Sequence, residues 1–183
     1  MRAYHMTTKS KLREIEKSGV LEPRTSTGMY RTRLNVNGYE EQFNSGLYGK
    51  LWHNRFLVCG ANRDFSAWKD FGMYGLLKSE VVRGSSERDF FILNFEADVF
   101  LAMDHSHWSS AECKRLYGKN LFHMARQRRG LEGKDREDYY RQFALYISSL
   151  TDDTKEVKEF RVPELWLPDP VKFSEVEVLE LAA

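Results

Sequence analysis

The pattern of apolar and polar positions predicts a strand followed by a helix at the start of the chain. Residues 2–6 alternate between apolar or aromatic and polar side chains, which is typical of a short strand. Within Lys9–Ser18, Leu12 and Ile15 fall on one face of an amphipathic helix. Gly19 follows at the position where a helix commonly ends with positive φ. The opening therefore predicts a strand, then a helix that ends at Gly19.

The stretch that follows is polar and weakly alternating until a buried strand. Residues 24–54 contain four glycines, and Asn37-Gly38 is a favoured two-residue turn that predicts a hairpin. Phe56–Gly60 is a short apolar run that predicts a strand. A loop to Trp68 and a short helix or turn are expected after it.

The remaining patterns predict further strands with helices inserted between them. The expected strands are Leu76–Val82, Phe90–Phe95 leading into Val99–Ala102, Lys158–Val162 and Val171–Leu181, the last as an exposed edge. The expected helices are 108–129, which ends at Gly130, and Glu137–Leu150. These elements predict an α+β class with a mostly antiparallel sheet. A length of 183 residues fits a single domain over 1–183.

Composition and charge add little to this picture. The 28 basic and 27 acidic side chains nearly cancel. A local basic cluster is read first as a solvated helical face, and the alternative is a phosphate-binding or nucleic-acid patch. Its members are Lys114, Arg115, Lys119, Arg126, Arg128, Arg129, Lys134 and Arg136. Cys59 is expected in the core, and neither cysteine has metal-type spacing.

No apolar stretch has the length needed to cross a bilayer, so we expect no membrane partner. The absence of an N-terminal apolar segment and the two isolated cysteines favour a reducing compartment. The expected site of action is the cytoplasm, and secretion as an effector is the alternative.

The opening residues carry a resemblance to a known family. Tyr4-His5-Met6-Thr7, followed by the amphipathic helix and its glycine, resembles the opening of the ADP-ribosyltransferase superfamily. The branch in question has a histidine in its first strand and includes the poly(ADP-ribose) polymerases and many bacterial toxins. The resemblance implies a split, mostly antiparallel sheet with flanking helices, and NAD⁺ as substrate. It also implies that His5 holds the nicotinamide ribose and that Thr7 supports the loop or a ribose hydroxyl.

In that family a second strand ends near a loop whose hydroxyl side chain flanks the nicotinamide. The matching strand here is Phe56–Gly60, and Ser66 is the first candidate in its loop. Phe65, Trp68 and Tyr74 are candidate stacking partners for the ring, although aromatic clusters after a strand more often belong to the core. The family's usual pattern is not cleanly present in this loop.

The third family element is a glutamate that opens a late strand. Glu159 in Glu159-Phe160-Arg161-Val162 is the best match, and Glu156 is the alternative if the register differs. Without the resemblance both read as surface charges. Val157 occupies the position where the family often has a second carboxylate or an amide, which argues against arginine-directed chemistry.

The function that the resemblance implies is transfer of ADP-ribose from NAD⁺ to a macromolecular acceptor, either protein or nucleic acid. Small proteins of this kind are often toxins, effectors or phage products. The alternatives are an NAD⁺ glycohydrolase and a non-catalytic binding module. The candidate donors to the NAD⁺ diphosphate are Arg2, Arg24, Arg31 and Arg33. The chain has no G-x-G-x-x-G after a strand, which argues against a Rossmann dehydrogenase.

Two other patterns suggest chemistry but have a simpler interpretation. Asp104 with His105 and His107 could form a metal cluster, but no further ligand stands near them in the sequence. We therefore expect a polar turn and no metal. Ser109-Ser110 lacks a nucleophile elbow, so we expect no hydrolase triad.

Overall fold

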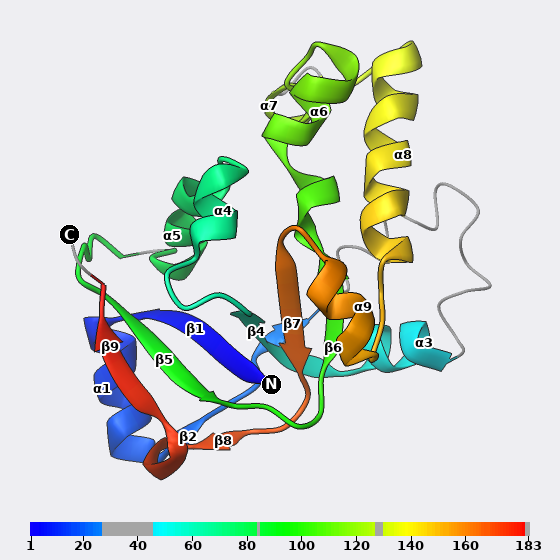
Figure 1. The fold of residues 1–183 in the computed structure, drawn as a ribbon. Coiled ribbons are helices and arrows are strands. Elements are labelled where there is room, and N and C mark those ends of the chain that lie inside the picture. Colours follow the sequence, from blue (N-terminus) through cyan, green and yellow to red (C-terminus); the bar gives the residue numbers. More distant parts are fainter. Residues whose placement is uncertain (27–45, 84, 127–129, 182–183) are drawn as a thin grey trace.

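The structure, a computed structural model, describes residues 1–26, 46–83, 85–126 and 130–181. It confirms the predicted α+β class, with a mostly antiparallel sheet and flanking helices (Figure 1). The hairpin expected at Asn37-Gly38 lies outside the described residues. Among those described, no helix is long and apolar enough to pass through a bilayer.

The main sheet has the strand order β6-β7-β4-β1-β5-β9, and every pairing along it is antiparallel. A short strand, β3, also pairs with β4, and β2 pairs with β8 in a separate small sheet. The strands are β1 Arg2–Thr8, β2 Val20–Leu21, β3 Thr25–Ser26, β4 Arg55–Gly60, β5 Phe90–Glu96, β6 Leu101–Asp104, β7 Pro163–Leu167, β8 Val171–Lys172 and β9 Glu177–Glu180.

The two halves of this sheet meet at a single pair of residues. Strands β1 and β4 are in register only at Tyr4 and Gly60, whereas β1 pairs with β5 along its whole length. Gly60 in turn pairs with Glu164 of β7. Past this row β1 leaves β4, and β3 pairs with the start of β4 instead. The sheet is therefore split, and Tyr4, Gly60 and Glu164 form the row that joins its halves.

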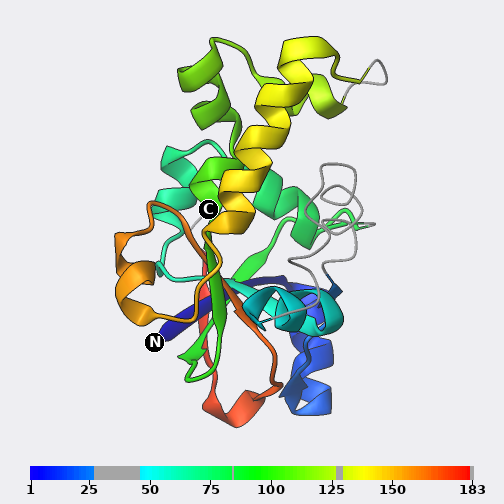
Figure 2. The ribbon, with the colours of Figure 1, turned by 90° about the vertical axis from the view of Figure 1, so that its right-hand side faces the viewer.

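The helices are distributed over both faces of the sheet (Figures 1 and 2). Helix α1 lies beside β1, β5 and β9, while α6, α7 and α8 form a helical lobe that rises above β6 and β7. The N-terminus lies beside α9 in both views. The bounds are α1 Lys9–Ser18, α3 Gly46–His53, α4 Ser66–Asp70, α5 Tyr74–Val81, η2 His105–Trp108, α6 Ser110–Tyr117, α7 Leu121–Arg126, α8 Gly133–Ser148, α9 Thr154–Glu159 and η3 Phe173–Glu175.

Apolar side chains fill both faces of the sheet. One cluster packs α1 and α9 against the sheet and includes Cys59, which is buried as predicted. A second cluster joins the helical lobe and α3 to the other face around Trp108. A third cluster packs α4 and α5 over β1 and β5 and contains Trp68. The third cluster and the helical lobe adjoin the Gly60–Glu164 row.

The predicted opening of the chain is confirmed. β1 runs from Arg2 to Thr8 and α1 covers Lys9–Ser18. Gly19 ends the helix with φ of 74° and donates its backbone N–H to the Ile15 carbonyl. The strand at Phe56–Gly60 is also present as part of β4.

The strand predicted at Leu76–Val82 is wrong, because this segment belongs to helix α5. Tyr74, Leu77 and Val81 are spaced at i, i+3 and i+7, and all three pack against the third cluster. Their helical spacing outweighs the β-branched and apolar composition that suggested a strand.

The strand predicted at Lys158–Val162 is also wrong. Residues 154–159 form helix α9, whose first turn is capped by the Asp153 carboxylate accepting the Lys155 backbone N–H. The strand begins only at Pro163. An aspartate cap before a short helix was the local signal that favoured this outcome.

Two longer predictions are divided by the structure. The helix expected at 108–129 begins as η2 and α6, and Gly118 ends α6 with φ of 69° before α7 starts. The strand expected at Val171–Leu181 is split into β8 and β9 by η3. β9 forms an edge of the main sheet, as predicted.

Candidate functional site

A buried carboxylate, Glu164, stands at the start of β7. It is only 5% exposed. Its Oε1 accepts a hydrogen bond from the Tyr146 hydroxyl at 2.6 Å and another from the Trp166 indole N–H at 2.8 Å. Its Oε2 lies 3.5 Å from Nε2 of His105. Buried charged groups with such specific partners are candidates for functional roles.

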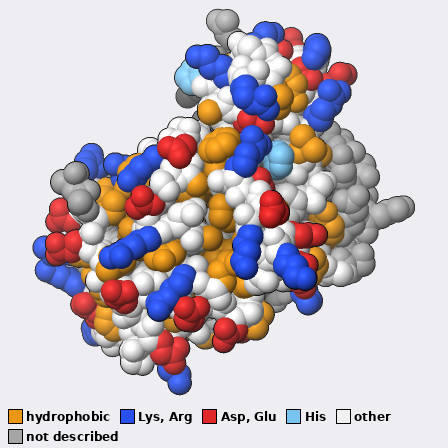
Figure 3. Space-filling model, viewed as in Figure 1, with side chains coloured by type: hydrophobic (Ala, Val, Ile, Leu, Met, Phe, Trp, Pro, Cys, Tyr) orange, Lys and Arg blue, Asp and Glu red, His pale blue; other side chains and the backbone are white. Residues whose placement is uncertain are grey.

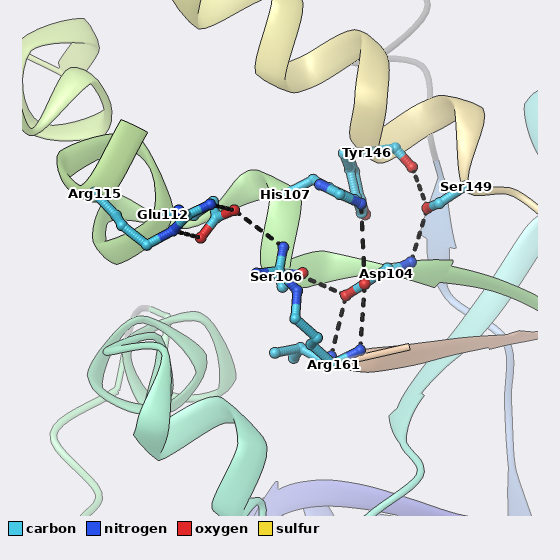
Figure 4. A network of polar contacts seen from close by, with 9 residues as sticks. Asp104, Ser106, His107, Glu112, Arg115, Tyr146, Ser149 and Arg161 are labelled. Carbon is cyan, nitrogen blue, oxygen red and sulfur yellow. Dashed lines mark hydrogen bonds and ion pairs between the residues drawn. The ribbon is translucent and has the colours of Figure 1, made fainter. Parts of the chain in front are cut away.

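A second buried carboxylate, Asp104, holds the turn that precedes Glu164 (Figure 4). Its Oδ1 accepts the backbone N–H groups of Ser106 at 3.0 Å and Val162 at 3.1 Å, and its Oδ2 accepts that of Arg161 at 3.3 Å. Burial alone would raise the pKa of Asp104, but these hydrogen bonds outweigh it and hold that pKa below its ordinary value. Asp104 is therefore ionised at neutral pH and fixes the chain immediately before Glu164.

Arg161 connects the same turn to helix α6. Its Nη2 donates to Glu112 at 3.1 Å, and Arg115 donates two further hydrogen bonds to Glu112 at 3.0 and 2.8 Å. The bonds from Arg115, with the help of Arg161, lower the pKa of Glu112 to about 2 even though burial opposes this shift. Figure 4 shows both arginines converging on this carboxylate. The Arg161 guanidinium also lies 5.2 Å from the centre of the Phe71 ring.

Aromatic side chains cover the sheet beside Glu164. A Cβ on Gly60 would lie 3.4 Å from the Trp68 indole nitrogen, so the indole rests directly on the backbone of β4. The Trp68 ring stands 4.8 Å from the His105 ring with an angle of 33° between the planes. The Trp68 N–H is buried, and it makes no hydrogen bond within the described part of the chain. Phe65, at the start of α4, has φ of 54°, which is strained for a bulky residue.

Replacing Gly60 with alanine is expected to lower the free energy of unfolding by about 1–3 kcal/mol, the usual cost of overpacking. The added methyl group would stand 2.9 Å from Cε1 of Phe65 and would displace the ring. Urea denaturation measures the change. Gly75→Ala in α5 is the matched control, because a Cβ there meets nothing within 4 Å. Equal stability of Gly60→Ala and wild type would contradict the described contact.

His5 lies just past the row that joins the two halves of the sheet. Its Nδ1 is 2.9 Å from the Val58 carbonyl oxygen, which can only accept, so Nδ1 carries the proton. Burial is the main cause that lowers the pKa of His5 and outweighs that hydrogen bond. The ring is therefore neutral at pH 7, and Nε2 is left as an acceptor nitrogen.

A pocket of about 300 Å³ lies where β1 begins, β4 ends and β7 begins. Arg2, Lys158 and Arg161 contribute positive charge to its wall. Asn62 also lines it, and its side-chain oxygen is buried without a hydrogen-bond partner among the described residues. Pro163, in the wall, directly precedes Glu164. Arg2 also forms an ion pair with Glu96 at 2.7 Å.

The predicted glutamates do not lie where the prediction placed them. Glu159 and Glu156 are both exposed on helix α9 rather than at the mouth of a strand. The glutamate that the structure places near the start of the late strand is Glu164. It stands five residues after Glu159 and, unlike it, is buried.

The predicted nicotinamide-flanking residues are placed as follows. Trp68 contacts the ring of His105, and His105 in turn faces Glu164. Ser66 begins α4, and its backbone N–H bonds the Asp64 carboxylate. Phe65 is almost fully buried. The ammonium groups of Lys69 and Lys78 lie over the Tyr74 ring, 5.0 and 4.8 Å from its centre. Thr7 is buried in β1.

The histidines at 105 and 107 form part of a short 3₁₀ helix, so the predicted polar turn is a single helical turn. His107 Nε2 lies 3.9 Å from Asp104, while His105 faces Glu164. In the part of the chain that the structure covers, no group of three or more His, Cys, Asp or Glu side chains is arranged to hold a metal ion.

Much of the basic cluster is paired with acidic side chains. Arg115 binds Glu112, Lys119 binds Asp135 at 2.8 Å, and Lys134 binds Asp138 at 2.5 Å. Over the helical lobe, basic side chains stand beside acidic ones (Figure 3). This pairing favours a solvated helical face over a phosphate-binding patch.

Glu164, Asp104 and His105 were not recognised as site residues from the sequence. Glu164 did carry a local signal, because it is a single charge within the apolar segment Val162–Leu167. A charge inside an otherwise apolar strand is rarely buried without a partner. Asp104 was considered only as a metal ligand, and His105 as a metal ligand or as a member of a hydrolase triad.

No protein-family model, curated protein or solved structure matches this chain.

Proposed function

We propose that this protein cleaves NAD⁺ at the nicotinamide–ribose bond and transfers ADP-ribose to a macromolecule, with Glu164 as the catalytic carboxylate. The observation that carries the proposal is the buried Glu164 near the start of β7, two strands from the histidine strand β1. It replaces Glu159 as our choice for the glutamate, since Glu159 is exposed on a helix.

Glu164 and His5 lie on opposite faces of the sheet. Tyr4, Gly60 and Glu164 share one row and therefore one face, and β1 and β7 are two strand spacings apart, or roughly 10 Å. His5 is the next residue of β1 and pairs with Leu93 on the face that helix α1 covers. The proposal therefore rests on Glu164 and its neighbours, and the family role of His5 is not part of it.

The chemistry requires a negative charge close to the ribose. Breaking the nicotinamide–ribose bond builds positive charge on the sugar, as in glycoside hydrolysis. The Glu164 carboxylate stabilises that charge and accepts the proton of the attacking acceptor. Its bonds from Tyr146 and Trp166 fix its orientation before the reaction, which limits the reorganisation needed in the transition state.

The charged pocket supports binding of the diphosphate. Arg2, one of the predicted donors, lines it together with Lys158 and Arg161. Its volume is at the lower end of the range for small-molecule sites, so it suits part of a dinucleotide. Arg24 is not among the residues that line it, and Arg31 and Arg33 lie outside the described residues.

Access to Glu164 requires a neighbouring side chain to move, since Glu164 is only 5% exposed. Trp68 is the neighbour best suited to do so. Its buried N–H has no partner among the described residues, and helix α4 starts at the strained Phe65. Displacement of the indole would open a flat slot against His105 that matches the nicotinamide ring. In this arrangement Trp68 acts by moving aside, which differs from its predicted role as a stacking partner of the nicotinamide ring.

Incubation of the purified protein with NAD⁺ labelled in the adenosine half and a cell lysate tests the proposal. We expect release of nicotinamide and transfer of label to protein or nucleic acid, identified by mass spectrometry. Free ADP-ribose without a labelled macromolecule would replace the transferase by a glycohydrolase. Intact NAD⁺ with no thermal shift at millimolar concentration would overturn the proposed function.

A further inference from the structure

His105 is the side chain that faces the available oxygen of Glu164. The ring is 6% exposed and lies between Trp68 and Tyr146, with centroid distances of 4.8 and 5.2 Å. Its Nδ1 is 3.0 Å from the Met73 sulfur, and its backbone N–H donates to the Val162 carbonyl at 2.9 Å. The ring is therefore in contact with two aromatic side chains and held at its backbone, with Nε2 3.5 Å from the carboxylate.

The two oxygens of Glu164 have different surroundings. Oε1 already accepts two hydrogen bonds, from Tyr146 and Trp166. Oε2 faces only the imidazole, at 3.5 Å, among the contacts of the described residues. Oε2 is thus the oxygen with lone pairs left for a reacting group, and His105 is the group next to it.

We propose that His105 is a positioning residue that takes up the proton that Glu164 removes from the acceptor. This inference rests on the proposed function. The nicotinamide–ribose C–N bond breaks with its electron pair leaving on nicotinamide, and the acceptor oxygen or nitrogen bonds to the ribose carbon. The acceptor proton passes to Oε2 of Glu164 and then to Nε2 of His105. The transfer returns Glu164 to its carboxylate form.

Other titratable groups lie near His105, but each is paired with another group or keeps its own proton. Tyr146 on α8 already donates its hydroxyl proton to Glu164. Glu112 on α6 is paired with Arg115 and Arg161, and burial keeps the Cys113 thiol protonated by raising its pKa to about 12. Asp104 and His107, in the same segment, face each other at 3.9 Å. The contacts with Trp68 and Met73 add no titratable group.

The mechanism predicts a loss of activity when the proton acceptor beside Glu164 is removed. His105→Gln should lower kcat for transfer by about 10²-fold. Imidazole added to His105→Gly should restore part of the rate. His53→Gln, an exposed histidine in α3, serves as the control and should behave as wild type.

Each outcome decides the inference separately from the proposed function. Thermal unfolding of every variant identifies loss of fold, and His105→Asn provides a second variant if His105→Gln unfolds. A His105→Gln enzyme with the wild-type rate would overturn the role of His105. So would a His105→Gly enzyme whose rate does not rise when imidazole is added. Absence of NAD⁺ cleavage by wild type would instead reject the proposed function.

Discussion

Replacing Asp104 with alanine is expected to lower the free energy of unfolding at pH 7 by about 3 kcal/mol, within the range for breaking a buried charged network. The carboxylate accepts three backbone N–H groups, from Ser106, Arg161 and Val162. Asp104 is only 6% exposed, so these donors would be left without their partner in a site that water reaches poorly. Chemical denaturation monitored by circular dichroism measures the loss.

The stability lost in Asp104→Ala is expected to be largest at neutral pH and to shrink as pH falls. The native pKa of Asp104 lies below its ordinary value, so the unfolded chain binds the proton first as pH falls. The stabilisation is therefore present at neutral pH and disappears as pH drops through about 4 and below. We expect the difference between wild type and Asp104→Ala to shrink over that interval. Asp98→Ala, at an exposed carboxylate, is the control, and an equal loss in both variants would contradict the account.

Local patterns predicted the start of the fold well. The apolar spacing of α1 and the glycine after it act within one or two helical turns, so they are readable from neighbouring residues alone. The strand at Phe56–Gly60 was similarly evident from a short apolar run. The α+β class followed from the mixture of these patterns.

The late glutamate shows where local patterns fail. Lys158–Val162 has the composition of a strand, yet Asp153 caps a helical turn and Val157 packs it against the sheet. The strand therefore starts later, and the candidate moves from Glu159 to Glu164. The Asp153 cap and the packing of Val157 together outweighed a local composition that favoured a strand.

The site itself depends on contacts between distant segments. Glu164 meets Tyr146 and His105 because β7 pairs with β6 and α8 packs on η2. Asp104 reaches Val162 across 58 positions of sequence. Single-sequence patterns carry no information on such strand order, so Asp104 and His105 could not be assigned to this site before the topology was known.

Glu164→Gln is expected to reduce the rate of nicotinamide release from NAD⁺ by about 10²–10³-fold, the usual cost of removing a preorganised charge-stabilising group. The amide keeps the shape of the side chain, and its oxygen can still accept from Tyr146 and Trp166. It lacks the negative charge that offsets the developing charge on the ribose. The effect should therefore appear in kcat with little change in NAD⁺ binding.

The most direct test of the NAD⁺-cleaving site compares Glu164→Gln and Glu159→Gln in one nicotinamide-release assay beside wild type. The two glutamates differ in burial and environment, since Glu159 is exposed at the end of α9. We predict that Glu159→Gln retains the wild-type rate within about twofold while Glu164→Gln loses about 10²-fold or more. A wild-type protein that releases no nicotinamide, or a Glu164→Gln variant as active as wild type, would contradict the account.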